Sequence, residues 1–210
     1  AVVSTQSTAR FLMSQDRIHS QKPSPGRPRS QEVTHAILST AIRLMEQHGY
    51  KKLSMESIAK ASGAGKQTLY RWWPTKAALV LEAMKSQCEL EIPVPDHGNA
   101  RQDLWEYIQN TCNLLNGPTG KMIAALIVES QFDEDFSHLF HKEFISTRRE
   151  ALTSILQKGV DRGEIHSSQE LNFLADLCYG PIWYRLLNRH APLDEAFTQE
   201  IVTTILSLKN

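Results

Sequence analysis

Apolar positions recur every three to four residues along most of the chain, which is the period of an amphipathic α-helix. In the first such segment, Ser30 is a residue type that caps helix N-termini, and Gly49 suits a left-handed position at a helix end. The pattern therefore predicts a first helix between Ser30 and Gly49, and its apolar stripe is formed by Val33, Ile37, Ala41, Leu44 and Met45.

Three shorter helices are predicted next. Ser54 and Thr75 are N-cap residue types placed before the first and third of them, and the Ser-Gly-Ala-Gly run at 62–65 separates the first from the second. Pro74 stops the second helix because proline cannot continue it. The expected spans are 55–61, 66–73 and 76 to about 86.

Two prolines and a glycine between Ile92 and Asn99 exclude a helix there and indicate a boundary. After this segment the periodicity is again helical, and nothing in the pattern predicts a strand-rich domain. The fold class expected is all-α, with an N-terminal three-helix unit and a C-terminal helical bundle. The helices expected in the bundle span about 101–116, 121–132, 135–162, 168–190 and 193–208.

The first 24 residues are polar and small, show no sustained period and are expected to form a disordered leader. The predicted domains are then 25–86 and 87–210. The chain has neither a run of about 20 apolar residues nor a secretory apolar segment, so we expect a cytoplasmic protein that does not enter a membrane. Its three cysteines, Cys88, Cys112 and Cys178, lack any Cys-x-x-Cys pairing, so no disulfide framework or structural zinc site is expected. Thiol redox sensing is the alternative to inert, buried cysteines.

The net charge of zero hides a division of charge along the chain. From Lys22 to Lys85 there are 11 Lys and Arg against 4 Asp and Glu, whereas from Ser86 to Asn210 there are 10 against 18. A net charge of +7 on the first part suits contact with a polyanion such as nucleic acid. Solvated surface charge is the alternative interpretation.

Two short helices joined by a tight turn that contains glycine, the second rich in Lys, Gln, Thr, Tyr and Arg, are typical of a helix-turn-helix. We expect Leu69 and Trp73 to face the core of the unit and the other side to enter the major groove. Tyr70 is better placed to donate to a phosphate than to read a base. In these two short helices and next to them, the residues predicted to contact DNA are Ser54, Lys66, Gln67, Thr68, Tyr70, Arg71, Trp72 and Lys76.

The run from Leu53 to Leu79, together with Ala41, Leu44 and the Gly49-Tyr50 step, resembles the DNA-binding signature of the tetracycline-repressor (TetR/AcrR) family of bacterial regulators. The resemblance covers about Gln31 to Met84. It implies a dimeric transcriptional regulator in the bacterial nucleoid, most simply a repressor, that a small-molecule effector releases from double-stranded operator DNA. It also implies that Lys76 contacts a phosphate.

Two positions depart from the family pattern. Gly65 stands where many members have Ser or Thr at the N-cap of the recognition helix, and it offers no side chain to a phosphate. Gln67 stands where many have a small residue, so it is our candidate for direct base reading, with a purely solvated role as the alternative. Ahead of the first helix, Arg27 and Arg29 flank Pro28 in an extended basic arm that can enter the minor groove or serve as a solubilising tail.

The C-terminal half resembles the ligand-binding and dimerisation half of the family in length and helical order. Its strongly apolar last two helices are predicted to pair with a second copy, with completion of the chain's own core as the alternative. The residues predicted for this interface are Leu171, Leu174, Cys178, Ile182, Leu186, Phe197, Ile201 and Ile205. A ligand pocket, for which plain core packing is the alternative, is predicted among Trp105, Ile108, Cys112, Met122, Leu126, Phe144, Leu152 and Trp183.

No catalytic motif or cofactor site is recognised in the sequence. His138 and His141 stand one helical turn apart, but they lack a third fixed ligand, so a solvated helix face is favoured over a metal site. Two other classes of function stay open at this point: an interaction or carrier protein that binds DNA weakly and without sequence preference, and an enzyme that uses a C-terminal cavity.

Overall fold

The computed structural model describes residues 30–166 and 168–208, and all regular secondary structure within these ranges is helical. The predicted all-α fold class is therefore confirmed. The predicted leader and the basic arm with Arg27 and Arg29 lie outside the described residues. Among the residues that are described, no helix is long and apolar enough to span a bilayer.

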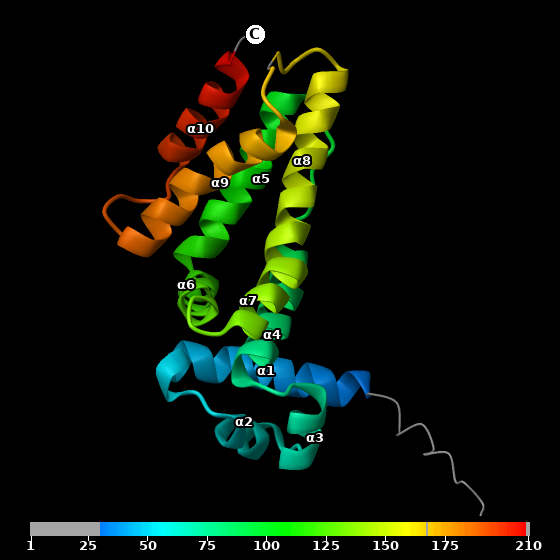
Figure 1. Cartoon of the computed structure of the whole chain (residues 1–210), viewed down its shortest axis with the longest axis vertical. Helices are drawn as coiled ribbons and strands as arrows, with labels where there is room; N and C mark the ends of the chain where they lie inside the picture. Colours follow the sequence, from blue (N-terminus) through cyan, green and yellow to red (C-terminus); the bar gives the residue numbers. More distant parts are fainter. Residues whose placement is uncertain (1–29, 167, 209–210) are drawn as a thin grey trace, which may run out of the picture. The chain divides into compact units, whose positions relative to one another are not determined.

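Four helices and a short 3-10 turn form the N-terminal unit (Figure 1). Four residues of the apolar stripe predicted for the first helix are buried in one core with Ile58 and Leu69, and these are Ile37, Ala41, Leu44 and Met45. The fifth, Val33, is 39% exposed. Gly49 ends the first helix at φ 75°, a left-handed conformation that glycine adopts without steric cost. The elements are α1 (Gln31–His48), η1 (Tyr50–Lys52), α2 (Met55–Ser62), α3 (Lys66–Trp72) and α4 (Lys76–Glu91).

Helix α4 is longer than the sequence analysis predicted. It was expected to end near Ser86, but it continues to Glu91, and the backbone N–H of Ile92 donates to the carbonyl of Cys88 at 3.0 Å. The physical reason is that Cys88 and Ile92 are both buried against the C-terminal bundle, which extends the helix until Pro93 stops it. The predicted domain boundary between 86 and 87 therefore falls inside a continuous helix.

Six α-helices and one π-helical turn make up the C-terminal bundle. Helix α5 contacts α6, α8, α9 and α10, and α9 contacts α8 and α10, so α5 and α9 lie between α8 and α10 in Figure 1. Their bounds are α5 (Ala100–Asn116), α6 (Pro118–Ser130), α7 (Glu134–Phe140), η2 (His141–Ile145), α8 (Ser146–Asp161), α9 (Leu171–Asn188) and α10 (Glu195–Ser207).

Several predicted helix limits are corrected by local capping. Helix α6 begins at Pro118 rather than at Lys121, because proline is well suited to the first turn of a helix, where no backbone N–H is needed. Helix α10 begins after Asp194, whose side chain accepts a hydrogen bond from the N–H of Phe197 at 3.0 Å. The single helix predicted over 135–162 is interrupted by the π-helical turn η2.

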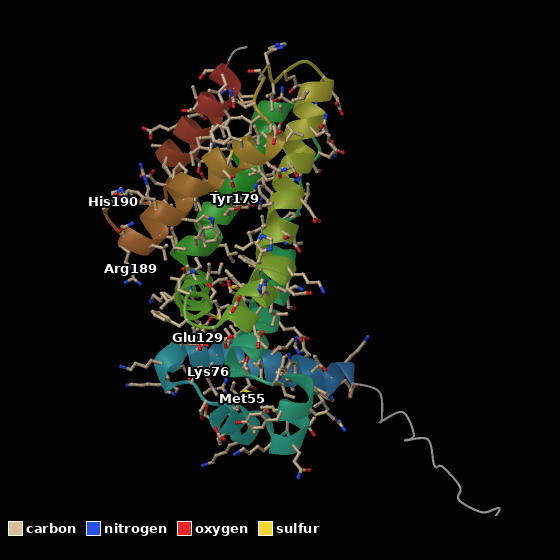
Figure 2. All side chains as sticks on the ribbon, viewed as in Figure 1. Met55, Lys76, Glu129, Tyr179, Arg189 and His190 are labelled. Atoms are coloured by element: carbon tan, nitrogen blue, oxygen red, sulfur yellow. The ribbon has the colours of Figure 1, made fainter. Side chains whose placement is uncertain are left out.

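A buried hydrogen-bonded pair of tyrosines ties three helices of the bundle together. The hydroxyl oxygens of Tyr107 in α5 and Tyr179 in α9 lie 3.1 Å apart, and they lie 3.3 and 3.0 Å from the backbone carbonyl oxygen of Arg148 in α8. Each hydroxyl has one proton, so when one donates to the carbonyl the other can donate to its hydroxyl oxygen. Tyr179 is labelled in Figure 2. Buried hydroxyls that have partners in this way fix the register of the helices they connect.

Candidate DNA-binding site

Helix α2 begins at a capping box and ends at a left-handed glycine. Ser54 and Ser57 form a reciprocal capping box at the start of α2, with both backbone-to-hydroxyl distances at 3.1 Å. Gly63 ends α2 in a left-handed conformation, φ 71°, so the chain can reverse within three residues. Ser54, one of the predicted DNA-contacting residues, is thus placed as the N-cap of the supporting helix.

One side of α3 is held in the core. Leu69 is fully buried and Trp73 is 2% exposed, as the sequence predicted, and the indole N–H of Trp73 donates to a carboxylate oxygen of Glu82 at 2.7 Å. The opposite side of the helix carries Lys66, Gln67, Tyr70 and Arg71, all of them exposed. The orientation needed for a recognition helix is therefore present: a buried face to fix it and a polar face directed outward.

Glu56 in α2 holds two of the predicted DNA-contacting side chains. Its carboxylate lies 2.6 Å from the ammonium group of Lys66 and accepts a hydrogen bond from the Tyr70 hydroxyl at 3.4 Å. The Lys66 ammonium lowers the pKa of Glu56, and Glu56 in turn raises the pKa of Lys66. The sequence analysis missed Glu56, because its importance arises from a contact across the turn and not from a motif.

Trp72 and Thr68 are less accessible than the rest of the predicted contact set. Both are half-buried, and the Trp72 ring packs edge-to-face on Trp73 at a centroid distance of 5.7 Å. The guanidinium carbon of Arg71 lies 5.8 Å from the Trp72 ring centroid. At that separation the ring can restrict the position of the Arg71 side chain. Trp72 is therefore placed mainly as a support.

Lys76 is attached to the N-terminal unit by its own side chain. Its ammonium group donates to the backbone carbonyl of Tyr50 at 3.0 Å and lies 3.9 Å from the centroid of the Tyr50 ring. Thr75 caps α4 at the same point, with its hydroxyl oxygen accepting from the N–H of Ala78 at 3.1 Å. An ammonium group has three N–H donors, so one is bound to η1 and the contact with a phosphate implied for Lys76 stays a prediction.

Three further lysines belong to the surface of this unit. Lys51 and Lys52 in η1 and Lys60 in α2 are exposed, and none of them was among the predicted contacts. The sequence did contain a signal for two of them, because Lys51 and Lys52 stand next to each other just before the capped helix α2. Together with Lys66 and Arg71, they make the exterior of the unit basic, as the division of charge along the sequence indicated.

The residues predicted for a dimer interface are largely inside the chain's own core. Leu174, Cys178, Ile182, Phe197, Ile201 and Ile205 are at most 6% exposed, so they are not available to a second copy, and this prediction is corrected. Leu171 and Leu186 are half-buried. The exposed apolar side chains of α9 are on the other face, and they are Phe173, Leu177, Tyr184 and Leu187. The sequence analysis could not tell which face of α9 is turned outward, because this helix is apolar on nearly all sides.

Most of the residues predicted for a ligand pocket are also core residues, and two of them line a cavity. Phe144 and Trp183 line an internal cavity of about 20 Å³. Trp105 is half-buried and packs against the core. The other five are at most 1% exposed and are core residues, which was the alternative interpretation: Ile108, Cys112, Met122, Leu126 and Leu152. The structure brings other residues to the cavity that the sequence did not single out, including Arg148 and Tyr179.

His138 and His141 do not belong to a cluster of ligating side chains. Within 30–166 and 168–208, no group of three or more His, Cys, Asp or Glu side chains is arranged to hold a metal ion. His138 lies 4.0 Å from a carboxylate oxygen of Glu134, four residues earlier, and both side chains are more than 80% exposed.

Comparison with known proteins identifies both parts of the chain. Residues 37–83 match the family described as "Bacterial regulatory proteins, tetR family", and residues 94–205 match "Tetracyclin repressor-like, C-terminal domain". The Bacillus subtilis protein YdeS, an uncharacterized HTH-type transcriptional regulator, is 32% identical over 84% of this chain and 89% of its own length.

A repressor and a solved structure extend the comparison. The DNA-binding transcriptional repressor TetR of Mycobacteroides abscessus is 26% identical over 85% of this chain and 94% of its own. The crystal structure of a TetR family transcription regulator superposes with a TM-score of 0.74 at 30% identity, and the match covers 84% of this chain and 97% of that one. The helix-turn-helix geometry, the two family matches and these relatives agree, and the chain belongs to the TetR family of bacterial transcriptional regulators.

Proposed function

We propose that this regulator binds operator DNA as a homodimer, in the cytoplasm, and represses transcription until a small-molecule effector occupies the C-terminal bundle. The basic, outward-facing side of α3 supports contact with the major groove. No catalytic role is proposed for any residue, because the family and its relatives are regulators by name.

The observation that carries the proposal is that one helix belongs to both parts of the molecule. The first residue of α4, Lys76, is attached to η1 beside the helix-turn-helix, and near its end Cys88 lines the cavity in the bundle. Between them, Lys85 lies 2.5 Å from Glu143 of η2. A ligand that displaces the wall of the cavity therefore acts directly on the helix that positions α3.

A binding experiment tests the DNA-binding half of the proposal. The purified protein is titrated against its own upstream intergenic DNA and against a scrambled sequence at one fixed salt concentration. We expect preference for the natural sequence, and we expect the double variant Lys66→Ala, Tyr70→Phe to lower operator affinity by about tenfold or more. Lys142→Ala, an exposed lysine in η2, is the matched control. Equal affinity of the wild type for both sequences, or an unchanged double variant, would contradict sequence-specific binding.

The exposed apolar face of α9 supports dimerisation. Phe173, Leu177, Tyr184 and Leu187 are 37–62% exposed and recur at helical spacing, so they form one stripe. Exposed apolar stripes of this kind are typical of contact surfaces. A second copy is the occupant we propose, because a helix-turn-helix monomer reads one half-site and a twofold pair places two reading heads on a palindrome.

Sedimentation of a charged variant tests the dimer. Leu177→Arg together with Tyr184→Arg should shift the protein from dimer to monomer and reduce operator binding, because like charges without a partner cannot be desolvated in an apolar contact. Phe132→Arg is the control, since Phe132 is 88% exposed and lies outside the stripe. A wild-type protein that sediments as a monomer at micromolar concentration would overturn the dimer while leaving the DNA-binding unit unaffected.

A further inference from the structure

Three residues separate an internal cavity from an open groove in the C-terminal bundle. The cavity of about 20 Å³ and the groove of about 320 Å³ are both lined by Arg148, Tyr179 and Trp183. The rest of the cavity is mostly apolar and includes side chains from α4, α5, α6 and η2, for example Ile92, Leu115, Ile123 and Phe144. The two spaces are thus neighbours that share a wall of three side chains.

Trp183 is the movable part of that wall. Tyr179 is fixed by its hydroxyl bonds to Tyr107 and to the Arg148 carbonyl, and it is buried. Trp183 stacks on Tyr179 at a centroid distance of 6.2 Å but is only half-buried, so an outward rotation of its ring would break fewer contacts than a movement of Tyr179. Such a rotation would join the cavity to the groove. The combined space then falls at the lower end of the range for small-molecule sites, about 300–1,000 Å³.

Gly180 keeps the groove open. It lies within α9, and a Cβ atom built on it would meet no atom within 4 Å. Glycine inside a helix lowers stability by roughly 0.5–1 kcal/mol relative to alanine, so its presence here is not explained by helix formation. The space above it is open in a single copy, and it lies on the same side of α9 as Leu177 and Tyr184, which we assign to the second copy.

One nitrogen of the Arg148 guanidinium has no partner in the part of the chain that the structure describes, although the same side chain also bonds to the Tyr107 hydroxyl. Its guanidinium Nη1 atom is buried and has no hydrogen-bond partner among the described residues. Burying a charged donor without a partner is costly, and native proteins rarely do so. Lys85 and Glu143 line a small neighbouring space with Arg148, but the Glu143 carboxylate is paired with Lys85 at 2.5 Å.

The neighbouring Arg149, unlike Arg148, has partners for its guanidinium group. Arg149 lines the same groove, but its guanidinium is paired with the carboxylate of Asp176 and donates to the backbone carbonyl of Asn172 at 3.1 Å. Burial also raises the pKa of Tyr107 and Tyr179, so neither hydroxyl carries a negative charge at neutral pH. An incoming anion would therefore meet one unpaired guanidinium nitrogen and no phenolate.

We propose that the effector is a small molecule with an apolar body and a carboxylate group, which enters past Trp183 and binds the Arg148 guanidinium. The carboxylate provides the acceptor that Nη1 lacks. The apolar body lies mainly in the groove of about 320 Å³ beside Ile145 and Trp183, because the cavity beside Ile123 and Phe144 adds only about 20 Å³. This proposal rests on the proposed function, because it assigns a chemical class to the effector.

Calorimetry with matched probes tests the proposal. Straight-chain carboxylates from hexanoate to dodecanoate, and the primary amide of each, are titrated into the full-length protein at neutral pH. We expect at least one acid to bind about tenfold or more tightly than its amide, as a charge-assisted hydrogen bond predicts. No binding by any acid at millimolar concentration, or equal binding of acid and amide, would overturn the proposal.

Three variants of two neighbouring arginines identify the donor. Arg148→Met should bring the affinity for the acid down to that for the amide, and Arg148→Lys should restore part of the preference. Arg149→Met, which alters the adjacent, already paired arginine, should keep the full preference. A preference that survives Arg148→Met would overturn the assignment. Thermal unfolding of each variant shows whether it is folded, and Arg148→Lys serves as the test if Arg148→Met is not.

The same samples separate this inference from the proposed function. Operator binding is measured without any probe and then with the best acid. Failure of the unliganded wild type to prefer its own upstream DNA would contradict the proposed function, whereas the calorimetric comparison would still decide the carboxylate site. Acids that bind through Arg148 but leave operator affinity unchanged would overturn their assignment as effectors.

Discussion

The ammonium group of Lys85 and the carboxylate of Glu143 lie 2.5 Å apart, and this ion pair connects α4 to the π-helical turn η2. Phe144, the next residue after Glu143, lines the internal cavity. The pair therefore lies between the space that we assign to an effector and the helix that begins at Lys76. A π-helical turn inside a longer helix is commonly found at functional positions.

Replacing Glu143 with Gln should weaken this connection more than it weakens the fold. Both side chains are about one third exposed, so we expect a loss of unfolding free energy of at most about 1 kcal/mol. The effector response, measured as the ratio of operator affinities without and with ligand, should fall severalfold. Glu134→Gln, an exposed carboxylate in α7, is the control. A full response in Glu143→Gln would exclude the pair as part of the coupling.

The same ion pair predicts a pH dependence. Lys85 lowers the pKa of Glu143 below its usual value of 4.5. A carboxylate with a lower pKa in the folded state contributes stability that is present above its unfolded pKa and is lost as the pH falls through the folded value. Wild type and Glu143→Gln should therefore differ in melting temperature near pH 6 and converge below about pH 4. A difference that persists in acid would assign the effect to another cause.

Glu56→Gln should strengthen DNA binding. The substitution frees Lys66 and Tyr70 from a competing carboxylate and removes a negative charge from a surface that would face phosphates. We expect roughly threefold to tenfold tighter binding at low salt, with a larger gain for scrambled DNA than for the operator. Glu46→Gln, which alters an exposed carboxylate of α1, provides the comparison. Weaker binding of Glu56→Gln would show that Glu56 orients these side chains for DNA.

Two helical glycines should respond to alanine in opposite directions. A Cβ at Gly120 would lie 1.9 Å from the backbone oxygen of Leu115, so α6 could not pack against the end of α5. We expect Gly120→Ala to lower the unfolding free energy by about 2–4 kcal/mol. Gly180→Ala, where the space is open, should raise it by about 0.5–1 kcal/mol. Chemical denaturation measures the unfolding free energy of both variants. A Gly120→Ala protein as stable as the wild type would contradict the close contact at Gly120.

The cysteines should resist alkylation in the folded protein. Cys88, Cys112 and Cys178 are all buried, and burial raises the pKa of the Cys178 thiol to about 12. Little thiolate of Cys178 then exists at pH 8, and thiolate is the reactive form, while burial also keeps the reagent away from Cys88 and Cys112. Mass spectrometry after iodoacetamide treatment should show modification only when denaturant is added. Rapid labelling of the native protein would support the redox-sensing alternative.

Local chemistry made the DNA-binding unit predictable from the sequence. The cap residues Ser54 and Thr75 and the turn glycine Gly63 act within a few residues of their own position, so their roles can be recognised without the fold. The period that buries Leu69 and exposes Lys66 and Arg71 is also local. The family signature in this segment could be recognised for the same reason, because it consists of these local features.

Only the tertiary structure decided which faces of the C-terminal helices are free. Helix α9 is apolar on most sides, so its sequence does not show that Leu174 and Cys178 are buried while Leu177 and Tyr184 are exposed. The Lys85–Glu143 pair and the contact of Tyr107 with Tyr179 join residues 58 and 72 positions apart. Contacts at that separation depend on how whole helices pack, and no period in the sequence encodes them.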